Sequence, residues 1–361
     1  MGFKFDTMIK SDQILLNGVV YNQQNIDELF CADEAKDSWQ NSIYYFLQNW
    51  FDDSDSILAQ TSGSTGKPKD IRLAKQAMIN SAKMTNEFFA LDHSKTALLC
   101  LPASYIAGKM MIVRAITGNF NLITVEPNAN PFENLNTEID FTAITPYQLF
   151  HSAESLKTQT VRKIIVGGAP VTTKLEKLTD AIPSEMFETY GMTETSSHIA
   201  LRRFNGSDKT DCFSILKGIR IRKDERDCLV INAPLIIDED IITNDIVELI
   251  NENSFRWLGR YDSIINSGGI KVHPEQIEKK LEGLIHQNYF ISSMPDDLLE
   301  NKIILIIESK KYSKKRETAL IELIGESLSK YQIPKHIYYL PNFIYSESNK
   351  LLKNKTLEIV L

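Results

Sequence analysis

Residues 60–69 (QTSGSTGKPK) combine hydroxyl side chains, two glycines and two lysines, a composition suited to binding phosphate groups. Small residues expose backbone N–H groups, hydroxyls donate hydrogen bonds and lysines supply positive charge, so such a loop can surround a polyphosphate. A Walker P-loop needs four residues between its glycines and a Ser or Thr after its lysine. Here Ser64 and Thr65 alone separate the glycines, and a proline follows the first lysine. The loop therefore indicates a phosphate site of a different kind, with a flexible Ser/Gly linker as the alternative.

Further motifs follow this loop in a fixed order along the chain. They are residues 190–194 (YGMTE), 243–245 (TND), 259–262 (GRYD), 268–275 (GGIKVHPE) and 346–353 (SESNKLLK). Together with the loop, they resemble the adenylate-forming superfamily of acyl-CoA synthetases, adenylation domains and luciferases. The resemblance covers about residues 55–361. Within the superfamily the chain is most similar to a short bacterial o-succinylbenzoate–CoA ligase, because of residues 191–197, residues 101–108 and the compact length.

This resemblance implies an ATP-dependent, AMP-forming acid–thiol ligase of menaquinone biosynthesis. A small carboxylic acid attacks the α-phosphate of ATP and expels pyrophosphate, and the thiol of coenzyme A then attacks the acyl adenylate. ATP, Mg²⁺ and coenzyme A are the implied cofactor and co-substrates. Negative charge crowds the first transition state, so the enzyme must supply cations and oriented N–H groups there.

The resemblance also implies which residues bind ATP. The β- and γ-phosphates would lie against Thr61, Ser62, Gly63, Ser64, Thr65, Gly66 and Lys67. The adenine would lie against Gly168, Ala169, Pro170, Tyr190 and Gly191. Asp245 would accept the ribose hydroxyls with help from Arg260, although a simple turn aspartate is the alternative, since Asn244 stands where the family usually has glycine.

Three residues are implied to be catalytic. Thr193 would bind the α-phosphate, and Glu194 would hold Mg²⁺, a hard cation that prefers oxygen ligands. Lys350 would be the mobile lysine that bridges the α-phosphate and the attacking carboxylate. A surface carboxylate is the alternative for Glu194, and Lys353 or Lys355 are the alternatives for the catalytic lysine.

The acid and thiol sites are implied more loosely. Residues Tyr105, Lys109, Thr195 and Ser196 are expected to line the acid pocket. o-Succinylbenzoate has a second carboxylate that needs a cation, and Lys109 and Arg114 are both candidates, with solvent-directed side chains as the alternative. Asp262 would be the hinge, and Gly268 and Gly269 would line the channel for coenzyme A. His198 is expected to be structural, because an ionised acid needs no general base.

The elements that must position these residues follow from the periodicity. Apolar strand-like runs alternate with helical patterns, which favours an α/β domain with mostly parallel sheets. The expected strands are 97–101, 122–125, 141–144, 163–166, 186–189 and 255–259, and the expected helices are 39–51, 74–90, 106–117, 146–156 and 171–181. Ligands bind at the carboxyl ends of such strands, where residues 167–170 and 190–191 fall.

Beyond residue 260 the pattern changes to that of a small α+β lobe. The expected strands are 264–266, 270–272, 303–307 and 337–340, with helices from Pro274 and at 314–329. We therefore predict an N-terminal AMP-binding domain at 1–259, a hinge at 260–263 and a mobile C-terminal lobe at 264–361 that carries the catalytic lysine. The phosphate loop lies over a hundred residues in for most of the family, so the N-terminal subdomain that helps to form the acid pocket is expected to be shortened.

Composition limits the remaining function classes. The 361 residues carry a net charge of −7, which gives no footprint for nucleic-acid binding. The four cysteines form no CxxC pair, as is typical of a reducing compartment. No apolar run reaches membrane-spanning length and the N-terminus lacks a signal-peptide pattern, so we expect a cytoplasmic protein. A homo-oligomer is compatible with the sequence. The rival functions are another acyl- or aryl-CoA ligase, a standalone adenylation enzyme, or a non-catalytic nucleotide- or acyl-binding protein.

Overall fold

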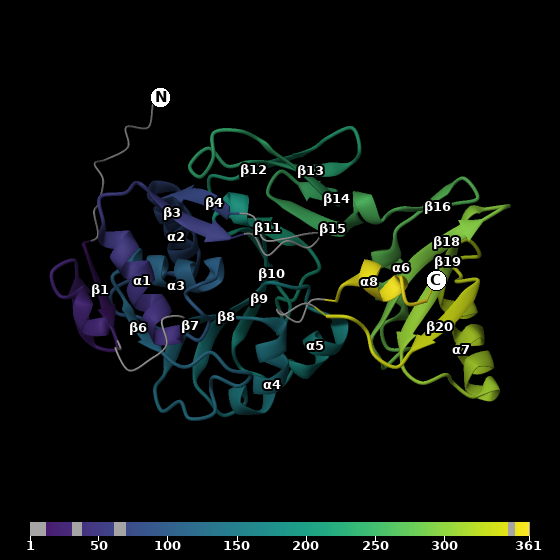
Figure 1. Ribbon diagram of the computed structural model, residues 1–361, viewed down its shortest axis with the longest axis horizontal. Coiled ribbons are helices and arrows are strands. Elements are labelled where there is room, and N and C mark those ends of the chain that lie inside the picture. Colours follow the sequence, from purple (N-terminus) through teal and green to yellow (C-terminus); the bar gives the residue numbers. More distant parts are fainter. Residues whose placement is uncertain (1–11, 31–37, 61–69, 346–350, 361) are drawn as a thin grey trace. The chain divides into compact units, whose positions relative to one another are not determined.

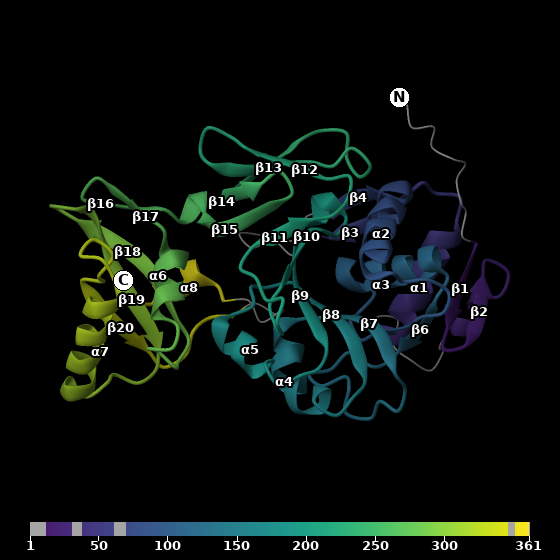
Figure 2. The same cartoon turned by 180° about the vertical axis from the view of Figure 1, so that it is seen from behind.

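The computed structural model describes residues 12–30, 38–60, 70–345 and 351–360, which belong to two units (Figures 1 and 2). Unit 1 takes in the described residues of Met1–Val171, Leu178–Arg220 and Asn232–Asp240. Unit 2 takes in those of Thr172–Lys177, Ile221–Ile231 and Ile241–Leu361. The domain boundary expected at 259/260 falls inside unit 2 and stays a prediction, as does the hinge.

Unit 1 is built on a mixed sheet whose central strands are parallel. Its strands are hydrogen-bonded in the order β11-β10-β9-β8-β7-β5-β6-β1-β2, and a separate hairpin pairs β3 with β4. They are β1 (Gln13–Leu16), β2 (Val19–Asn22), β3 (Ser56–Gln60), β4 (Asp70–Ala74), β5 (Thr96–Leu99), β6 (Asn121–Thr124), β7 (Ile139–Ile144), β8 (Val161–Val166), β9 (Glu185–Gly191), β10 (His198–Arg203) and β11 (Phe213–Ile215). The strand pairs β1–β6, β6–β5, β5–β7, β7–β8 and β8–β9 are parallel. The pairs β1–β2, β9–β10 and β10–β11 are antiparallel.

The parallel centre confirms the α/β expectation and each strand expected within it. Strand β7 ends in four consecutive buried residues, and β8 ends in three, so both faces of the sheet are covered there. That pattern distinguishes buried parallel strands from half-exposed antiparallel ones, which alternate. The antiparallel strands β2, β10 and β11, on either side of the parallel centre, were not expected, because their short apolar runs carry little periodicity.

The helices of unit 1 pack on this sheet and carry part of the site. They are α1 (Trp39–Phe51), α2 (Lys75–Phe89), α3 (Ile106–Gly118) and α4 (Pro146–Leu156), with a short 3-10 turn at η1 (Ile26–Leu29). All four helices confirm the expected ones. Helix α3 contacts β1, β5, β6 and β7, and α2 packs on α3. Gly108 makes the approach of α3 possible, since a Cβ there would lie 2.2 Å from the Pro102 carbonyl oxygen.

The strands of unit 2 form two hydrogen-bonded groups. The first runs β12-β13-β14-β15. Its strands are β12 (Arg220–Lys223), β13 (Cys228–Asn232), β14 (Ile241–Asn251) and β15 (Ser254–Arg260), followed by the 3-10 turn η3 (Tyr261–Ser263). In the second sheet β17-β16-β19-β18 are neighbours and β20 pairs with β19. The strands are β16 (Ile265–Ser267), β17 (Ile270–Val272), β18 (Tyr289–Asp296), β19 (Glu300–Glu308) and β20 (His336–Leu340), and the helices are α5 (Thr173–Leu178), α6 (Pro274–Leu281), α7 (Lys314–Ser327) and α8 (Lys353–Leu357).

Strand β19 is the centre of the small lobe. Ile303, Leu305 and Ile307 pack in one apolar cluster with residues of α6 and α7. Ile304 and Ile306 face the opposite way and pack with Phe290 and with side chains from α8. Because both faces are covered, the strand is apolar without alternation, as in the run that predicted it. The α+β character expected of this lobe is thus present; its mobility stays a prediction.

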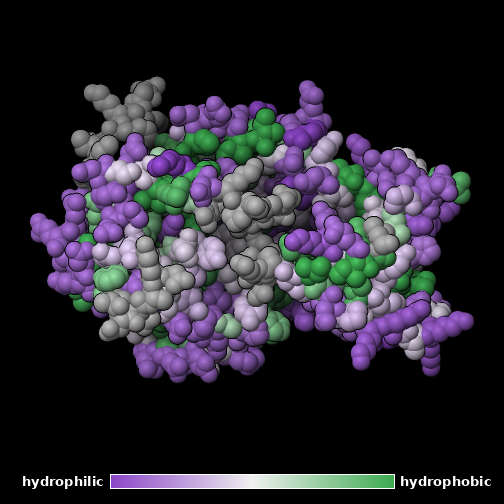
Figure 3. Space-filling view, viewed as in Figure 1, coloured by the Kyte–Doolittle hydropathy of each residue, from purple (hydrophilic) through white to green (hydrophobic). Residues whose placement is uncertain are grey.

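The surface of the described residues is mixed in character. On the face shown in Figure 3 apolar residues occur in separate areas among hydrophilic ones. Within the described part of the chain, no helix combines the length and the apolar character needed to cross a membrane.

Candidate active site

Two of the expected groups lie outside the described residues. The phosphate loop falls in 61–69, and Lys350 falls in 346–350. Their roles stay predictions. The residues that flank the loop are described: β3 and β4 pair antiparallel from Ser56 with Ala74 to Gln60 with Asp70.

The expected adenine residues lie at the ends of two neighbouring parallel strands of unit 1. Gly168, Ala169 and Pro170 follow β8, are exposed, and include a left-handed Gly168 at φ +91°. Tyr190 is the penultimate residue of β9, which pairs in parallel with β8 through Val166 and Glu188. The carboxyl ends of parallel strands meet at one edge, so the sheet brings the two groups together.

A buried carboxylate that was not expected holds the end of this loop. Glu188 on β9 accepts a hydrogen bond from the Val171 backbone N–H at 2.8 Å and pairs with Arg202 of β10 at 2.6 Å. One carboxylate oxygen of Glu188 therefore accepts a hydrogen bond and the other is paired with a cation. A glutamate within the apolar strand 186–189 was the only sequence indication of this role.

The turn after β9 carries the catalytic candidates. Thr193 is half-buried and Glu194 is exposed in the 3-10 turn η2 (Thr193–Thr195). Gly191 is required here, because a Cβ would lie 2.5 Å from the Ser197 carbonyl oxygen. Thr195 is buried and accepts a hydrogen bond from the Met192 N–H at 3.0 Å, so its hydroxyl supports the turn.

Arg114 of α3 is a buried cation beside this turn. It is 2% exposed, and its Nη2 donates to the Ser197 hydroxyl at 2.7 Å while its Nε has no partner among the described residues. No carboxylate of the described residues forms an ion pair with it. Burial lowers the pKa of Arg114 to about 9, so it is charged at neutral pH. The hydroxyl of Ser196 is also buried without a described partner.

His198 completes this polar cluster. Its Nε2 lies 3.2 Å from the Thr85 hydroxyl and its Nδ1 lies 3.4 Å from the Ser197 hydroxyl. Burial, and then the positive charge of Arg114, hold the pKa of His198 well below its usual 6.5. A neutral imidazole fits the structural role expected for it.

Lys109 and Tyr105 lie differently from Arg114. The Lys109 ammonium donates to the Leu58 carbonyl oxygen at 2.8 Å, and burial lowers its pKa. Tyr105 precedes α3 and is 60% exposed. Among the described residues neither candidate cation for a second carboxylate forms an ion pair. The Lys109 ammonium is bound by a backbone carbonyl oxygen, whereas Arg114 is buried with its Nε lacking a described partner.

The expected ribose and hinge residues form a connected group in unit 2. Asp245 on β14 pairs in register with Arg260 on β15, with 3.9 Å between Arg260 Nη1 and Asp245 Oδ1. The Trp257 indole also donates to Asp245 Oδ1 at 3.1 Å. Arg260 donates to both carboxylate oxygens of Asp262, at 3.0 and 2.7 Å, and this lowers the pKa of Asp262. The partnership of Arg260 with Asp262 was not expected.

Two further expectations concern the small lobe. Gly268 and Gly269 form the left-handed turn between β16 and β17, with φ values of +59° and +78°. Lys353, an alternative for the catalytic lysine, pairs with Glu278 of α6 at 2.8 Å. That contact makes Lys353 an anchor of the segment that follows Lys350.

The described side chains that could bind Mg²⁺ are few. Among the described residues no three His, Cys, Asp or Glu side chains cluster so as to hold an ion. Mg²⁺ is usually held by one or two carboxylates together with substrate phosphates, so an exposed Glu194 fits that manner of binding.

Comparisons with known proteins define the class. Residues 13–222 match the AMP-binding enzyme family, and the chain belongs to that family. A solved structure of an acyl-CoA synthetase (AMP-forming)/AMP-acid ligase II-like protein from Dyadobacter fermentans DSM 18053 is 32% identical, with a TM-score of 0.60. That alignment covers 94% of this chain and 98% of the other, so the two chains correspond over nearly their whole lengths.

Two further relatives have names that refer to the same acid, succinylbenzoate. The 2-succinylbenzoate–CoA ligase of Lactococcus lactis subsp. lactis (strain IL1403) is 24% identical over 91% of this chain and 79% of its own length. The O-succinylbenzoate coenzyme A synthetase of Bacillus subtilis, solved in complex with ATP and magnesium ion, is 21% identical with a TM-score of 0.69, covering 83% of this chain and 69% of that one. This last likeness shows the fold.

Proposed function

We propose that this chain is an ATP-dependent, AMP-forming acid–thiol ligase that converts 2-succinylbenzoate into its coenzyme A thioester in menaquinone biosynthesis. Family membership and the relatives named 2-succinylbenzoate–CoA ligase support the reaction class. The observation that supports the choice of acid is the buried position of the Arg114 cation beside the turn that follows β9.

The energetics of Arg114 favour an anionic ligand. Burying an ionised side chain without an opposite charge costs several kcal/mol, and proteins usually pair such groups. A guanidinium donates two parallel hydrogen bonds to a carboxylate, which suits the second carboxylate of a dicarboxylic acid. We therefore assign Arg114 to that carboxylate, with the unpartnered Ser196 hydroxyl as a neighbouring donor.

The other residues divide the reaction between them. Thr193 would bind the α-phosphate, and Asp245 would accept the ribose hydroxyls. Glu194 would hold Mg²⁺, which neutralises phosphate charge when bound. Gly168, Ala169 and Pro170 would approach the base through their backbone, while Tyr190 would offer its ring for stacking. The acid is already ionised at neutral pH, so its carboxylate can attack the α-phosphate without a general base.

The small lobe would serve both half-reactions. Lys350 would stabilise charge during adenylation, and a rotation at Asp262 would then bring the turn of Gly268 and Gly269 to the thiol of coenzyme A. Hinges of this kind are a few loop residues that absorb a change in backbone angles. The buried thiols of Cys100 and Cys228 are free, which fits a reducing compartment, so we propose a cytoplasmic location.

The test is a thioester assay with ATP, coenzyme A and a panel of acids. We expect 2-succinylbenzoate to give its thioester, and Lys350→Ala to slow adenylation by roughly 10²- to 10³-fold while sparing thioester formation from supplied acyl adenylate. Lys353→Ala tests the alternative catalytic lysine and should slow adenylation less than Lys350→Ala does. A thioester with a different acid would overturn the substrate. Failure of every acid to support pyrophosphate exchange would favour a non-catalytic binding protein.

A further inference from the structure

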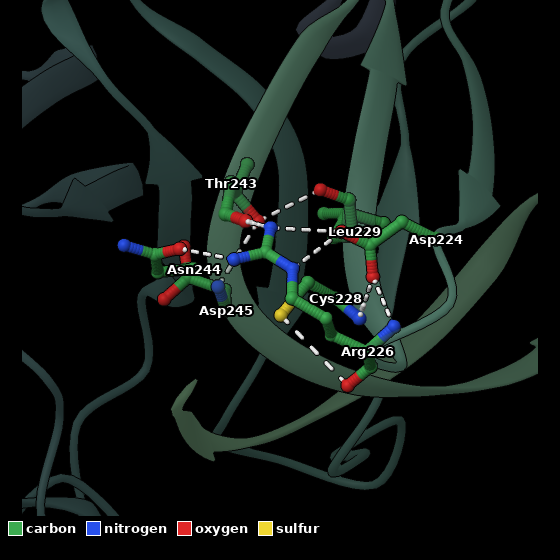
Figure 4. Close-up of polar contacts among 7 residues, drawn as sticks. All are labelled: Asp224, Arg226, Cys228, Leu229, Thr243, Asn244 and Asp245. Carbon is green, nitrogen blue, oxygen red and sulfur yellow. Dashed lines mark hydrogen bonds and ion pairs between the residues drawn. The ribbon is translucent and has the colours of Figure 1, made fainter. Parts of the chain in front are cut away.

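Arg226 links three segments of unit 2. It lies in the turn between β12 and β13, and its Nε and Nη2 donate to Asp224 Oδ2 at 2.9 and 2.8 Å. Figure 4 shows the guanidinium between Asp224 and strand β14. There Nη1 donates to Asn244 Oδ1 at 3.0 Å, and Nη2 donates to the Thr243 carbonyl oxygen at 3.1 Å.

The guanidinium is held in place before it meets β14. Asp224 Oδ1 accepts the backbone N–H groups of Arg226 and Cys228, at 2.8 and 2.9 Å. Burial opposes ionisation of Asp224, yet its hydrogen bonds with Arg226 and these N–H groups keep its pKa below the usual range. The hydrogen bond to Asp224 raises the pKa of Arg226. A fork fixed in this way loses little conformational entropy when it donates to a further acceptor.

On β14, Arg226 contacts Thr243 and Asn244, the two residues that precede Asp245. The Thr243 hydroxyl donates to the Leu229 carbonyl oxygen at 2.7 Å and accepts the Asp245 N–H at 3.0 Å. Arg226 thus holds the Thr243 carbonyl while β13 holds the Thr243 side chain. The backbone that presents the Asp245 carboxylate is fixed from two directions.

The same side chain reaches the segment between the two sheets. The Arg226 guanidinium carbon lies 5.1 Å from the centre of the Tyr261 ring, within cation–π distance. Tyr261 stands between Arg260 and Asp262, which are bonded to each other. The Arg226 side chain is 36% exposed, so contributing to a hydrophobic core is not its main role.

We propose that Arg226 is a positioning residue for nucleotide binding, which holds residues 243–244 so that the Asp245 carboxylate meets the ribose hydroxyls. The proposal rests on the function proposed above, because it takes Asp245 as the ribose anchor. It assigns no contact between Arg226 and the nucleotide. Asn244 contributes the side-chain acceptor that completes this attachment.

The test measures binding of MgATP and of Mg-2′-deoxy-ATP to the full chain by calorimetry, with no acid present. The wild type should prefer ATP, because the deoxy nucleotide lacks one hydroxyl for Asp245. Arg226→Met should weaken ATP binding roughly three- to tenfold. It should weaken 2′-deoxy-ATP binding less, because only the 3′-hydroxyl remains for Asp245, so the preference for ATP shrinks. Asn244→Ala should act in the same direction by roughly twofold, and less than additively with Arg226→Met.

Lys223→Met is the matched control, because it removes a nearby cation at the end of β12. The Lys223 ammonium pairs with Asp227 at 2.6 Å and, among the described residues, forms no hydrogen bond with β14. This variant should leave both affinities unchanged. If Arg226→Met weakens binding of the two nucleotides equally, so that the preference for ATP is unchanged, the positioning role is overturned while the proposed function stands. Absence of MgATP binding in the wild type would overturn both. Should Arg226→Met fail to fold, the ratio of the affinities for ATP and 2′-deoxy-ATP is measured in Asn244→Ala and Arg226→Lys instead.

Discussion

Two arginines are buried in unit 1, and their surroundings differ. Arg202 on β10 is 9% exposed and pairs with Glu188, whose other oxygen accepts a backbone N–H. Arg114 on α3 is 2% exposed and, among the described residues, bonds a serine hydroxyl and a methionine sulfur. The first region is electrically complete within the fold, whereas the second has a net positive charge in a buried place.

The difference separates a structural ion pair from a ligand site. A buried pair can offset its own desolvation, but a lone buried charge has no such compensation in the protein. The region of Arg202 fixes the loop that ends at Val171. The region of Arg114 contains no carboxylate partner among the described residues, so an anionic ligand could neutralise it. The predictions below test that contrast from the largest effect to the smallest.

Stability should respond oppositely to removal of the two cations. Arg202→Met leaves Glu188 buried without its partner, so the free energy of unfolding should fall by about 3–5 kcal/mol. Arg114→Met removes a charge that has no carboxylate partner among the described residues, together with the hydrogen bond to Ser197 and the weak one to the Met111 sulfur. The free energy of unfolding should therefore fall by no more than about 1 kcal/mol, or rise. Urea unfolding measures both. A loss of several kcal/mol in Arg114→Met would mean that this arginine is structural as well.

Asp245→Asn tests whether the nucleotide and the acid are bound by separate groups. A charged acceptor of the ribose hydroxyls is lost, so KM for ATP should rise roughly 10- to 100-fold, with little change in KM for the acid. Steady-state kinetics with each substrate varied checks this. Asp238→Asn, an exposed change of equal charge, should have no effect. A comparable rise in KM for the acid would break the assignment.

Acidification should expose the charge of the Arg114 region. Because burial and Arg114 lower the pKa of His198 in the folded state, the unfolded state takes up its proton first as the pH falls below 6.5. Stability is therefore retained above that pH and lost below it, by up to about 1.4 kcal/mol per pH unit from this residue. His198→Gln should flatten the unfolding free energy between pH 7 and 5. An identical slope in the variant would contradict the assignment.

The smallest effect should come from Lys109. Its ammonium is bound to the Leu58 carbonyl oxygen, so Lys109→Met should change KM for the acid by less than about threefold. The same kinetic assay compares it with Arg114→Met. A loss as large as that of the arginine variant would move the carboxylate partner to Lys109.

The sequence predicted most of the central fold but could not choose between these cations. Runs such as 163–166 and the helical pattern at 106–117 are dictated locally, so β8 and α3 were expected. Lys109 and Arg114 are five residues apart, which places them about 140° apart around the helix. One of them must face away from whatever the other faces. Only the packing of α3 against Ser197, far along the chain, shows which is buried.

The unexpected residues have the same physical origin. Trp257 reaches Asp245 because β14 and β15 pair in a particular antiparallel register, with shifts along it. Arg226 reaches Thr243 through a turn whose conformation depends on Asp224. Such contacts arise from strand pairing between distant segments, and composition and periodicity do not encode them. The phosphate loop and Lys350 were expected from motifs, and both lie outside the described residues.

The most direct test of the account compares two acids that differ by one carboxylate. The kcat/KM for thioester formation is measured with 2-succinylbenzoate and with 4-oxo-4-phenylbutanoate, which lacks the ring carboxylate, in the wild type and in Arg114→Met. We predict that the wild type prefers the dicarboxylic acid by roughly 10²- to 10³-fold and that Arg114→Met loses this preference through its loss on that acid alone. A preference that survives in Arg114→Met would contradict the claim that Arg114 selects the substrate.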